Sequence, residues 1–298
     1  MGFYPIATCT PGDYINNTAV KQRKSKIQKY NSRALGMNET RQLLMGLVVT
    51  VAVSLPYHNA TASSIDLGAA DGFAVLAMDT ITFAGSGVTH ITGDIGLSPG
   101  TSMPGIPENL SLIGVNHWAD GNTKSAQAAL ASAYTTAAGL TAQPGNIWGG
   151  AYDLGGSTLA PGVYKAVSFD ITGILTLSSD DPNAIWVFQT TETVKNHGVV
   201  QLQGHAQAGN VYWQVGSSAT LLGGSSFAGT IMAYKDITAV DGATVVGRLL
   251  AGATGIAGAV TMDNNEIVTP IPEPGTLRLF GIGIAMLGAF RRRFLSLV

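Results

Sequence analysis

The sequence has almost no cysteine and little charge. Its single thiol, Cys9, can form no intramolecular disulfide and no cysteine-based metal site, so stability must come from packing. Charged residues make up only 11% of the 298 residues and the formal net charge is -2, which leaves no electrostatic basis for binding nucleic acid. The chain is instead rich in alanine, threonine, serine and aliphatic residues, with 38 glycines, as is typical of strands joined by tight corners. We therefore expect a mainly β fold.

Groups of residues that carry out catalysis are also missing. The acidic residues of the central region are thinly scattered, and Asp180-Asp181-Pro182 is typical of a turn and not of an acid/base pair. The histidines at positions 90, 117, 197 and 205 lack the short spacing of metal ligands. The sequence therefore predicts no catalytic residue, no metal, no cofactor and no enzymatic activity.

The N-terminal region contains a candidate export signal. Residues 37–62 combine the parts of a secretory signal peptide, with a mainly apolar run over 43–55 and the small-residue cleavage site Ala60-Thr61-Ala62. We expect cleavage after Ala62 and a secreted mature protein. Residues 1–36 are basic and have no apolar periodicity, so we interpret them as a non-native extension. A basic arm that binds nucleic acid is the alternative.

The C-terminal residues 271–298 form a second candidate address signal. Pro272-Glu273-Pro274 is followed by a short apolar segment over 279–290 and by Arg291-Arg292-Arg293. This order resembles a PEP-CTERM sorting tag. The resemblance implies removal by an exosortase at the inner membrane of a Gram-negative bacterium, and a product that is secreted or held at the cell surface. A simple C-terminal membrane anchor is the alternative.

The intervening residues, 63–270, contain a repeat. Five segments begin with Gly or Asn and continue with a largely apolar run. They start at Gly162, Asn183, Gly209, Gly229 and Gly247, with spacings of 21, 26, 20 and 18 residues. Such spacing suits one turn of a three-sided coil, because a βαβ unit needs about 30 residues. The repeat predicts a parallel β-solenoid.

Each coil has three sides, which we number in chain order from the repeated apolar segment. The first side is apolar at successive positions, so both of its faces should be covered, whereas the second and third sides alternate and should each show one face to water. An Ala-rich segment without proline predicts one long helix at about 123–141, packed alongside the solenoid.

An ordered series of segments through residues 66–268 resembles the microbial ice-binding protein family. The segments are Phe73–Ala77, Ile91–Gly100, Leu159–Tyr164, Ile185–Gln189, Val211–Gly216 and Gly247–Ala251. The resemblance implies a right-handed parallel β-solenoid of triangular section, with N-terminal strands inserted beside the C-terminal coils and one long α-helix along one side. It also implies binding to an ice crystal surface through a flat exposed face.

Threonines on the second side are the candidate ice-binding residues. Stacked parallel strands repeat at about 4.8 Å, and threonine offers both a hydroxyl and a methyl on a stiff β-branched side chain. The predicted second-side row is Thr172, Thr193, Thr220, Thr238 and Thr254. A more mixed row of Thr176, Gln201, Ser226, Thr244 and Thr261 is predicted on the third side. Strand propensity alone also places threonines on exposed strands.

Two functions follow from these patterns. The first is a monomeric, extracellular ice-binding or antifreeze protein that inhibits ice growth and recrystallisation. The alternative is an extracellular matrix or adhesion module built on the same solenoid, which the sorting tag also permits.

Overall fold

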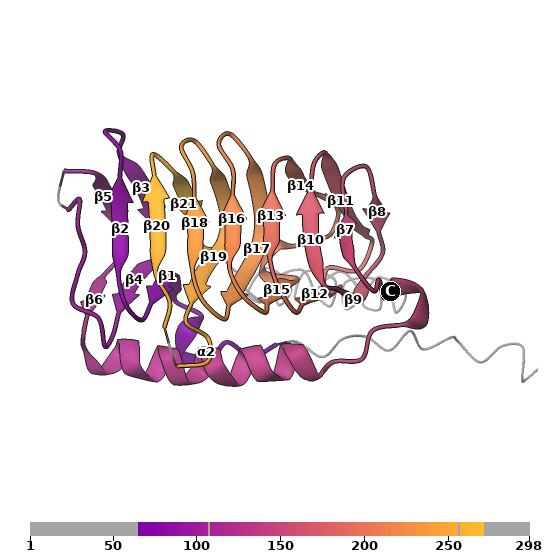
Figure 1. Cartoon of the computed structure of the whole chain (residues 1–298), viewed down its shortest axis with the longest axis horizontal. Coiled ribbons are helices and arrows are strands. Elements are labelled where there is room, and N and C mark those ends of the chain that lie inside the picture. The colour runs from indigo at the N-terminus through magenta and orange to yellow at the C-terminus, as the bar shows by residue number, and fades with distance from the viewer. Residues whose placement is uncertain (1–64, 107, 256, 271–298) are drawn as a thin grey trace, which may run out of the picture. The chain divides into compact units, whose positions relative to one another are not determined.

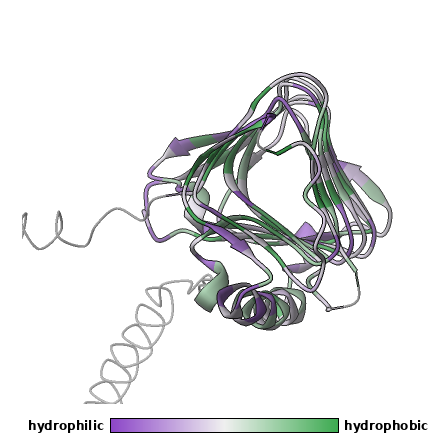
Figure 2. Cartoon of the chain, turned by 90° about the vertical axis from the view of Figure 1, so that its left-hand side faces the viewer, coloured by the Kyte–Doolittle hydropathy of each residue, from purple (hydrophilic) through white to green (hydrophobic). Residues whose placement is uncertain are grey.

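A stack of parallel β coils forms the body of the protein, whose structure is a computed structural model that describes residues 65–106, 108–255 and 257–270. Viewed along the stack, the coils form a triangle (Figure 2). One long helix runs along the whole stack (Figure 1). The mainly β fold, the parallel solenoid and its triangular section are therefore as predicted. The expected signal peptide at 37–62, the extension at 1–36 and the sorting tag at 271–298 lie outside the described residues.

Strands occupy all three sides of the triangle. The second side is a separate seven-stranded sheet, whereas the first and third sides share a 14-stranded sheet. The second side contains, in stacking order, β7 (Ala151–Asp153), β10 (Ser168–Ile171), β13 (Val194–Asn196), β16 (Ala219–Leu221), β18 (Ile237–Ala239), β20 (Val260–Asp263) and β2 (Ile81–Ala84). The third contains β8 (Thr158–Leu159), β11 (Ile174–Ser179), β14 (Val199–Gly204), β17 (Ser226–Ala233), β19 (Thr244–Ala251), β21 (Glu266–Val268), β3 (Thr89–Thr92) and β5 (Leu110–Ile113). The first contains β9 (Gly162–Ala166), β12 (Trp186–Thr190), β15 (Val211–Val215), the second halves of β17 and β19, β1 (Phe73–Ala77), β4 (Asp94–Leu97) and β6 (Asn116–Trp118).

The stacking order differs from the chain order. The N-terminal strand β1 pairs with β19, and β2 and β3 pair with β20 and β21, so the first coils of the chain stack upon its last. In Figure 1 the indigo β2 accordingly lies beside the yellow β20. The helix α2 (Gly121–Gly139) then carries the chain back to the far end of the stack, where β7, β8 and β9 begin the remaining coils. The expected insertion of N-terminal strands beside the C-terminal coils is therefore present.

Burial alternates along the short second-side strands. In β16 and β18 the first and third residues are buried inside the triangle and the middle threonine points outward. Larger side chains fill the interior elsewhere, and Tyr164, Phe188 and Trp213 stack in register, with ring centroids 5.3 and 3.9 Å apart. Aromatic stacking on successive coils adds to the apolar area that these rings bury. The interior is thus a continuous core that holds the sides rigid.

The first side is covered on both faces, as its unbroken apolar pattern predicted. All residues of β12, β15 and β1 are buried. Alanines and Leu130 on the buried face of α2 pack against the outer face of this side, in a second core that is separate from the interior of the triangle. The helix begins two residues before the expected position and ends two before it. Buried Gln189 donates hydrogen bonds to the carbonyls of Ala137 and Leu140 at 2.7 and 2.8 Å, which satisfies the C-terminal end of the helix.

Coil length varies at the corner between the third and first sides. Val163, Val187, Tyr212, Thr230 and Arg248 are paired in succession, so the steps between them are 24, 25, 18 and 18 residues. Two of the predicted segments, those that start at Asn183 and Gly209, therefore begin before the first residues that pair between coils. The reason is that loops of different length turn this corner. The strands β17 and β19 turn it without a loop and bend at Gly229 and Gly247, where a Cβ on Gly247 would lie 1.9 Å from the Gly229 carbonyl oxygen.

Among the described residues no helix is both long and apolar enough to cross a membrane.

An ion pair between a buried arginine and an exposed aspartate joins the N-terminal segment to the first side. Arg248 is 3% exposed, and its Nη2 donates to Oδ1 of Asp71 at 2.6 Å, whereas the Asp71 side chain is 58% exposed. The guanidinium also donates to the Asp71 carbonyl at 2.8 Å and to the Thr230 hydroxyl at 3.4 Å. Burial lowers the pKa of Arg248, and the charge of Asp71 opposes that shift. The pair holds the start of β1 against β19.

Because only one member of this pair is deeply buried, replacing Asp71 and replacing Arg248 should lower the free energy of unfolding by different amounts. Asp71→Ala leaves the buried guanidinium without its counter-charge and should lower the free energy of unfolding by about 2 kcal/mol, less than for a fully buried pair because Asp71 is in contact with water. Arg248→Met removes the buried charge itself and should cost less. Urea unfolding of both variants measures the two losses in free energy of unfolding, provided that the slope of this free energy against urea concentration is unchanged. A larger loss of free energy for Arg248→Met than for Asp71→Ala would contradict this account.

The N-terminal end of α2 is tied to the solenoid through a histidine. Asp120 caps the helix by accepting from the Thr123 amide at 2.9 Å, and its other oxygen lies 2.7 Å from Nδ1 of His117 on β6. Nε2 of His117 lies 3.4 Å from Asp94 on β4. The hydrogen bond to Asp120 is the main cause that raises the pKa of His117 above 6.5. The pKa of Asp120 is lowered to about 2, first by the Thr123 amide and then by His117.

Stability should therefore fall as the pH rises above about 6.5. The pKa of His117 is higher in the folded state than in the unfolded state. Protonated His117 therefore makes its full contribution to the free energy of unfolding below the unfolded-state pKa, and this contribution is lost as the pH rises through the folded-state pKa. Urea unfolding across this range should show the decline in the parent protein and not in His117→Gln. Replacing the exposed His205 by Gln is the matched control and should retain the decline, whereas an equal decline in His117→Gln would exclude His117 as the cause.

Candidate functional site

The outward residues of four neighbouring second-side strands form a single row of threonines. Thr220 on β16 pairs with Thr238 on β18, Thr238 with Thr261 on β20, and Thr261 with Thr82 on β2. We call these four residues the threonine row. Successive members are about 4.8 Å apart, as the pairing of strands requires. The row therefore spans about 14 Å along the stack.

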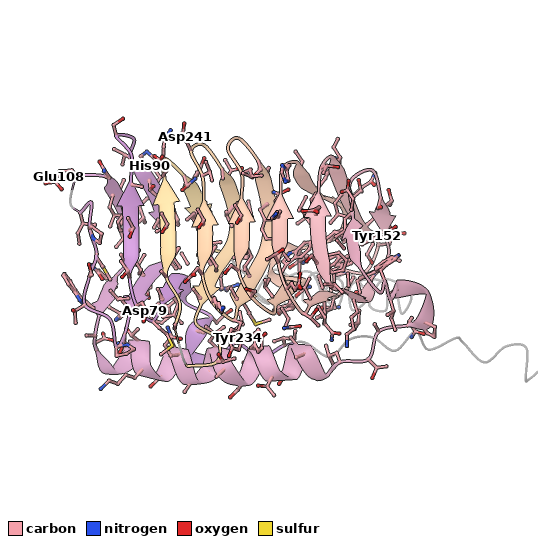
Figure 3. All side chains as sticks on the ribbon, in the orientation of Figure 1. Asp79, His90, Glu108, Tyr152, Tyr234 and Asp241 are labelled. Atoms are coloured by element: carbon pink, nitrogen blue, oxygen red, sulfur yellow. The ribbon has the colours of Figure 1, made fainter. Side chains whose placement is uncertain are left out.

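Small and apolar residues border most of the threonine row. The residues two places before its members are Ser218, Asp236, Ala259 and Thr80, and those two places after are Leu222, Val240, Asp263 and Ala84. Asp236 accepts a hydrogen bond from the Ala259 amide at 2.9 Å, which holds this carboxylate at the backbone. Asp79, Glu108 and Asp241 lie at the margins of this side, in the turns beyond its strands (Figure 3). The row itself contains no ionisable group.

The other half of the second side is charged. In β7, β10 and β13 the positions that align with the threonine row hold Asp153, Asp170 and Lys195. Asp153 accepts hydrogen bonds from the side chain and the amide of Thr172. The Thr172 side chain is the main cause that lowers the pKa of Asp153. Along this series of paired positions, the side chains thus change from charged to uncharged between Lys195 and Thr220.

The structure brings together two of the five threonines predicted for this surface. Thr220 and Thr238 are direct neighbours. Thr193 lies two residues before Lys195, beside Ser168 at 3.4 Å, and Thr172 lies two residues after Asp170 with its hydroxyl engaged by Asp153. Both keep an outward position because residues two apart on a strand share a face, but they lie outside the row. Thr254 is exposed in the turn after β19.

Thr261 and Thr82 were missed in the prediction of this side. Thr261 was assigned to the third side, but it lies on β20 of the second. Thr82 lies on an N-terminal strand that chain order alone does not place beside β20. The available signal was local, since Ile81-Thr82-Phe83 and Val260-Thr261-Met262 repeat the apolar-Thr-apolar pattern of Ile237-Thr238-Ala239.

The predicted third-side row is also divided. Thr176 pairs with Gln201, and Ser226 pairs with Thr244, but the two pairs lie in different rows because Ser226 aligns with Val199 and not with Gln201. Thr261 lies on the second side. The five residues predicted for the third side therefore do not form one continuous row.

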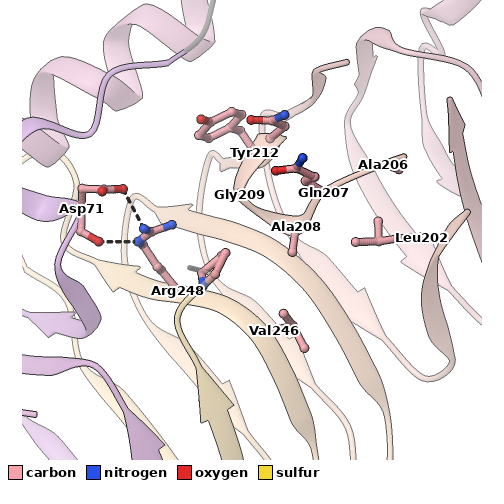
Figure 4. A pocket seen from close by; sticks show the side chains of 11 residues that line it. Asp71, Leu202, Ala206, Gln207, Ala208, Gly209, Tyr212, Val246 and Arg248 are labelled. Carbon is pink, nitrogen blue, oxygen red and sulfur yellow. Dashed lines mark hydrogen bonds and ion pairs between the residues drawn. The ribbon is translucent and has the colours of Figure 1, made fainter. Parts of the chain in front are cut away.

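A cavity of about 480 Å³ lies at the corner between the third and first sides. Leu202, Gln207, Tyr212, Val246 and Arg248 are among the side chains around it (Figure 4). Each of the three guanidinium nitrogens of Arg248 already has a hydrogen-bond acceptor, so the pair with Asp71 is structural. In the described part of the chain, no group of three or more His, Cys, Asp or Glu side chains is arranged to hold a metal ion.

Comparison with known proteins gives two family matches. Residues 75–268 match the ice-binding-like family, and residues 270–293 match the PEP-CTERM protein-sorting motif. An ice-binding protein from Nostoc sp. (strain HG1) is 40% identical over 267 residues, which cover 83% of this chain and 95% of that protein. An ice-binding protein from Flavobacterium frigoris (strain PS1) is 31% identical over 223 residues, which cover 70% of this chain and 78% of that protein.

Solved structures agree with the sequence matches. The crystal structure of the ice-binding protein from the Antarctic ascomycete Antarctomyces psychrotrophicus superposes with a TM-score of 0.65 at 36% identity, covering 70% of this chain and 100% of that one. An ice-binding protein from an Antarctic biological consortium gives a TM-score of 0.62 at 39% identity, covering 73% and 96%. By the extent of the family match and the identity to these relatives, the chain belongs to the ice-binding-like family.

Proposed function

We propose that this protein adsorbs to ice through the threonine row and thereby inhibits the growth and recrystallisation of ice outside the cell. The observation that carries the proposal is the in-register sequence Thr220, Thr238, Thr261 and Thr82, with no ionisable residue among its members. The names of the relatives from Nostoc and Antarctomyces support ice as the ligand. The adhesion alternative has only the sorting motif in its favour.

The physical argument depends on rigidity. Ice is a fixed lattice, so a surface that is already ordered loses little conformational entropy when it adsorbs. Backbone pairing sets the distance between threonines, and β-branching restricts each χ1 angle, so hydroxyls and methyls keep one arrangement. The methyl groups disfavour disordered water while the hydroxyls hydrogen-bond to ordered water. Many weak contacts can then add along the row.

The proposed surface replaces part of the predicted one. It retains Thr220 and Thr238, adds Thr261 and Thr82, and has Thr193 at its border. Thr172 does not contribute, because its hydroxyl already donates to Asp153. Thr254 is in a turn and not on the sheet.

From the sorting motif we further propose processing by an exosortase and a location outside a Gram-negative cell, secreted or at its surface. The expected signal peptide at 37–62 would supply export. We propose that the mature protein acts as a monomer.

Thr238→Tyr should lower ice activity about tenfold or more, which corresponds to about 1.4 kcal/mol of adsorption free energy. The ring would stand above the row and separate it from a flat crystal surface. The side chain points outward, so the free energy of unfolding should change by about 0.5 kcal/mol or less. The measurements are ice recrystallisation and binding of the fluorescently labelled purified protein to a single ice crystal.

Asp170→Tyr is the matched control, because Asp170 occupies the aligned position in the charged half of the same side. It should leave ice activity close to that of the parent. Normal coarsening of ice in the presence of the parent protein would exclude ice binding altogether. Full activity of Thr238→Tyr would instead place the binding surface on another side.

A further inference from the structure

Charged residues are distributed unequally between the two uncovered sides. The coils that carry Asp153, Asp170 and Lys195 on the second side continue into β8, β11 and β14, whose outward residues on the third side are uncharged. Among the described residues of the third-side strands, the outward ionisable side chains are Glu266 on β21 and His90 on β3. Arg248 is also on β19, but in the half of that strand that belongs to the first side. Each side therefore has one row of paired outward residues that carries no charge, and the two rows lie toward opposite ends of the stack.

The uncharged row of the third side is in register. Ile174 pairs with Val199, Val199 with Ser226, and Ser226 with Thr244, before Glu266 ends the row. We call these four residues the third-side ladder: Ile174, Val199, Ser226 and Thr244. Like the threonine row, it crosses four consecutive strands at the spacing of paired strands.

The ladder exposes aliphatic side chains to water. Ile174 is 52% exposed, Val199 is 38% exposed and neighbouring Val246 is 49% exposed. On the second side no large apolar side chain is exposed to this degree among the described residues. Exposed aliphatic side chains that lie on one side of a protein mark an interaction surface more often than isolated exposed residues do.

The chemistry of the ladder favours a crystal surface over a protein partner. Protein interfaces are enriched in aromatic residues, methionine and arginine, and the ladder has none of these. Three of its four members are β-branched, and all four are small or aliphatic with one outward side chain per strand. These are the properties that suit the threonine row to a fixed lattice of water.

We propose that the third-side ladder is a second ice-contacting surface, so that one molecule can engage two ice surfaces at once. The proposal rests on the proposed ice-binding function. Two sides of the triangular section face different directions (Figure 2), so the two surfaces meet different crystal planes or two adjoining crystals. A molecule held between adjoining crystals opposes the movement of their boundary, which is the step that recrystallisation requires.

The test compares single and double variants of the purified protein by binding of the fluorescent protein to a single ice crystal. Thr238→Tyr should remove one set of labelled planes and Val199→Lys the other. Residual binding of Thr238→Tyr should fall about tenfold or more when Val199→Lys is added. Gln203→Lys, on the same strand as Val199, is the matched control and should leave that residual binding unchanged. Thr244→Lys provides a second ladder variant if Val199→Lys fails to fold.

Three results would overturn the second surface. Thr238→Tyr alone could abolish all binding, which would leave the threonine row as the ice surface and remove the ladder. Both ladder variants could leave the residual binding unchanged. A dimer in solution that Val199→Lys dissociates would assign the ladder to a second copy of the chain. Failure of the parent protein to bind ice would overturn the proposed function as well, and is distinguishable from all three.

Discussion

Parallel pairing between backbones is the constraint on which the rest of the structure depends. It sets one spacing for every strand on all three sides, and residues on successive coils inherit that spacing whatever their side chains are. Thr238 and Thr261 lie side by side only because β18 pairs with β20. The buried aromatic stack of Tyr164, Phe188 and Trp213 depends on the same register inside the triangle. A regular outer surface and a rigid core therefore have a common origin.

Local patterns in the sequence predicted the parts of this fold that depend on local chemistry. Successive apolar residues predicted the covered first side, and an Ala-rich segment predicted the helix that covers it. The register was not predictable in this way, because corner loops of different length separate equivalent strands. Asn183 marks a corner, yet the paired residue is Trp186. Thr172 and Thr193 each lie two residues from the position that aligns with the threonine row. Residues two apart on a strand share a face, so the outward orientation predicted for both threonines is correct, whereas their place in the row is not.

Pairing between distant parts of the chain accounts for the two missed threonines. Ile81-Thr82-Phe83 has the pattern of a second-side strand, but no nearby residue indicates that it stacks beside Val260-Thr261-Met262. Charge was more informative, since the low content of ionisable residues agrees with an uncharged row of paired outward residues on each of the two uncovered sides. As a member of a family whose function is ice binding and not catalysis, the chain is not an enzyme.

The return of the chain along α2 has a consequence for biosynthesis. The first coils have no neighbour on one edge until β19, β20 and β21 exist, and Asp71 meets Arg248 across 177 residues. Proteins dominated by such distant contacts fold slowly, because a long loop must close before any contact rewards it. The coils of β1, β2 and β3 must therefore remain without their final partners until β19, β20 and β21 have been synthesised.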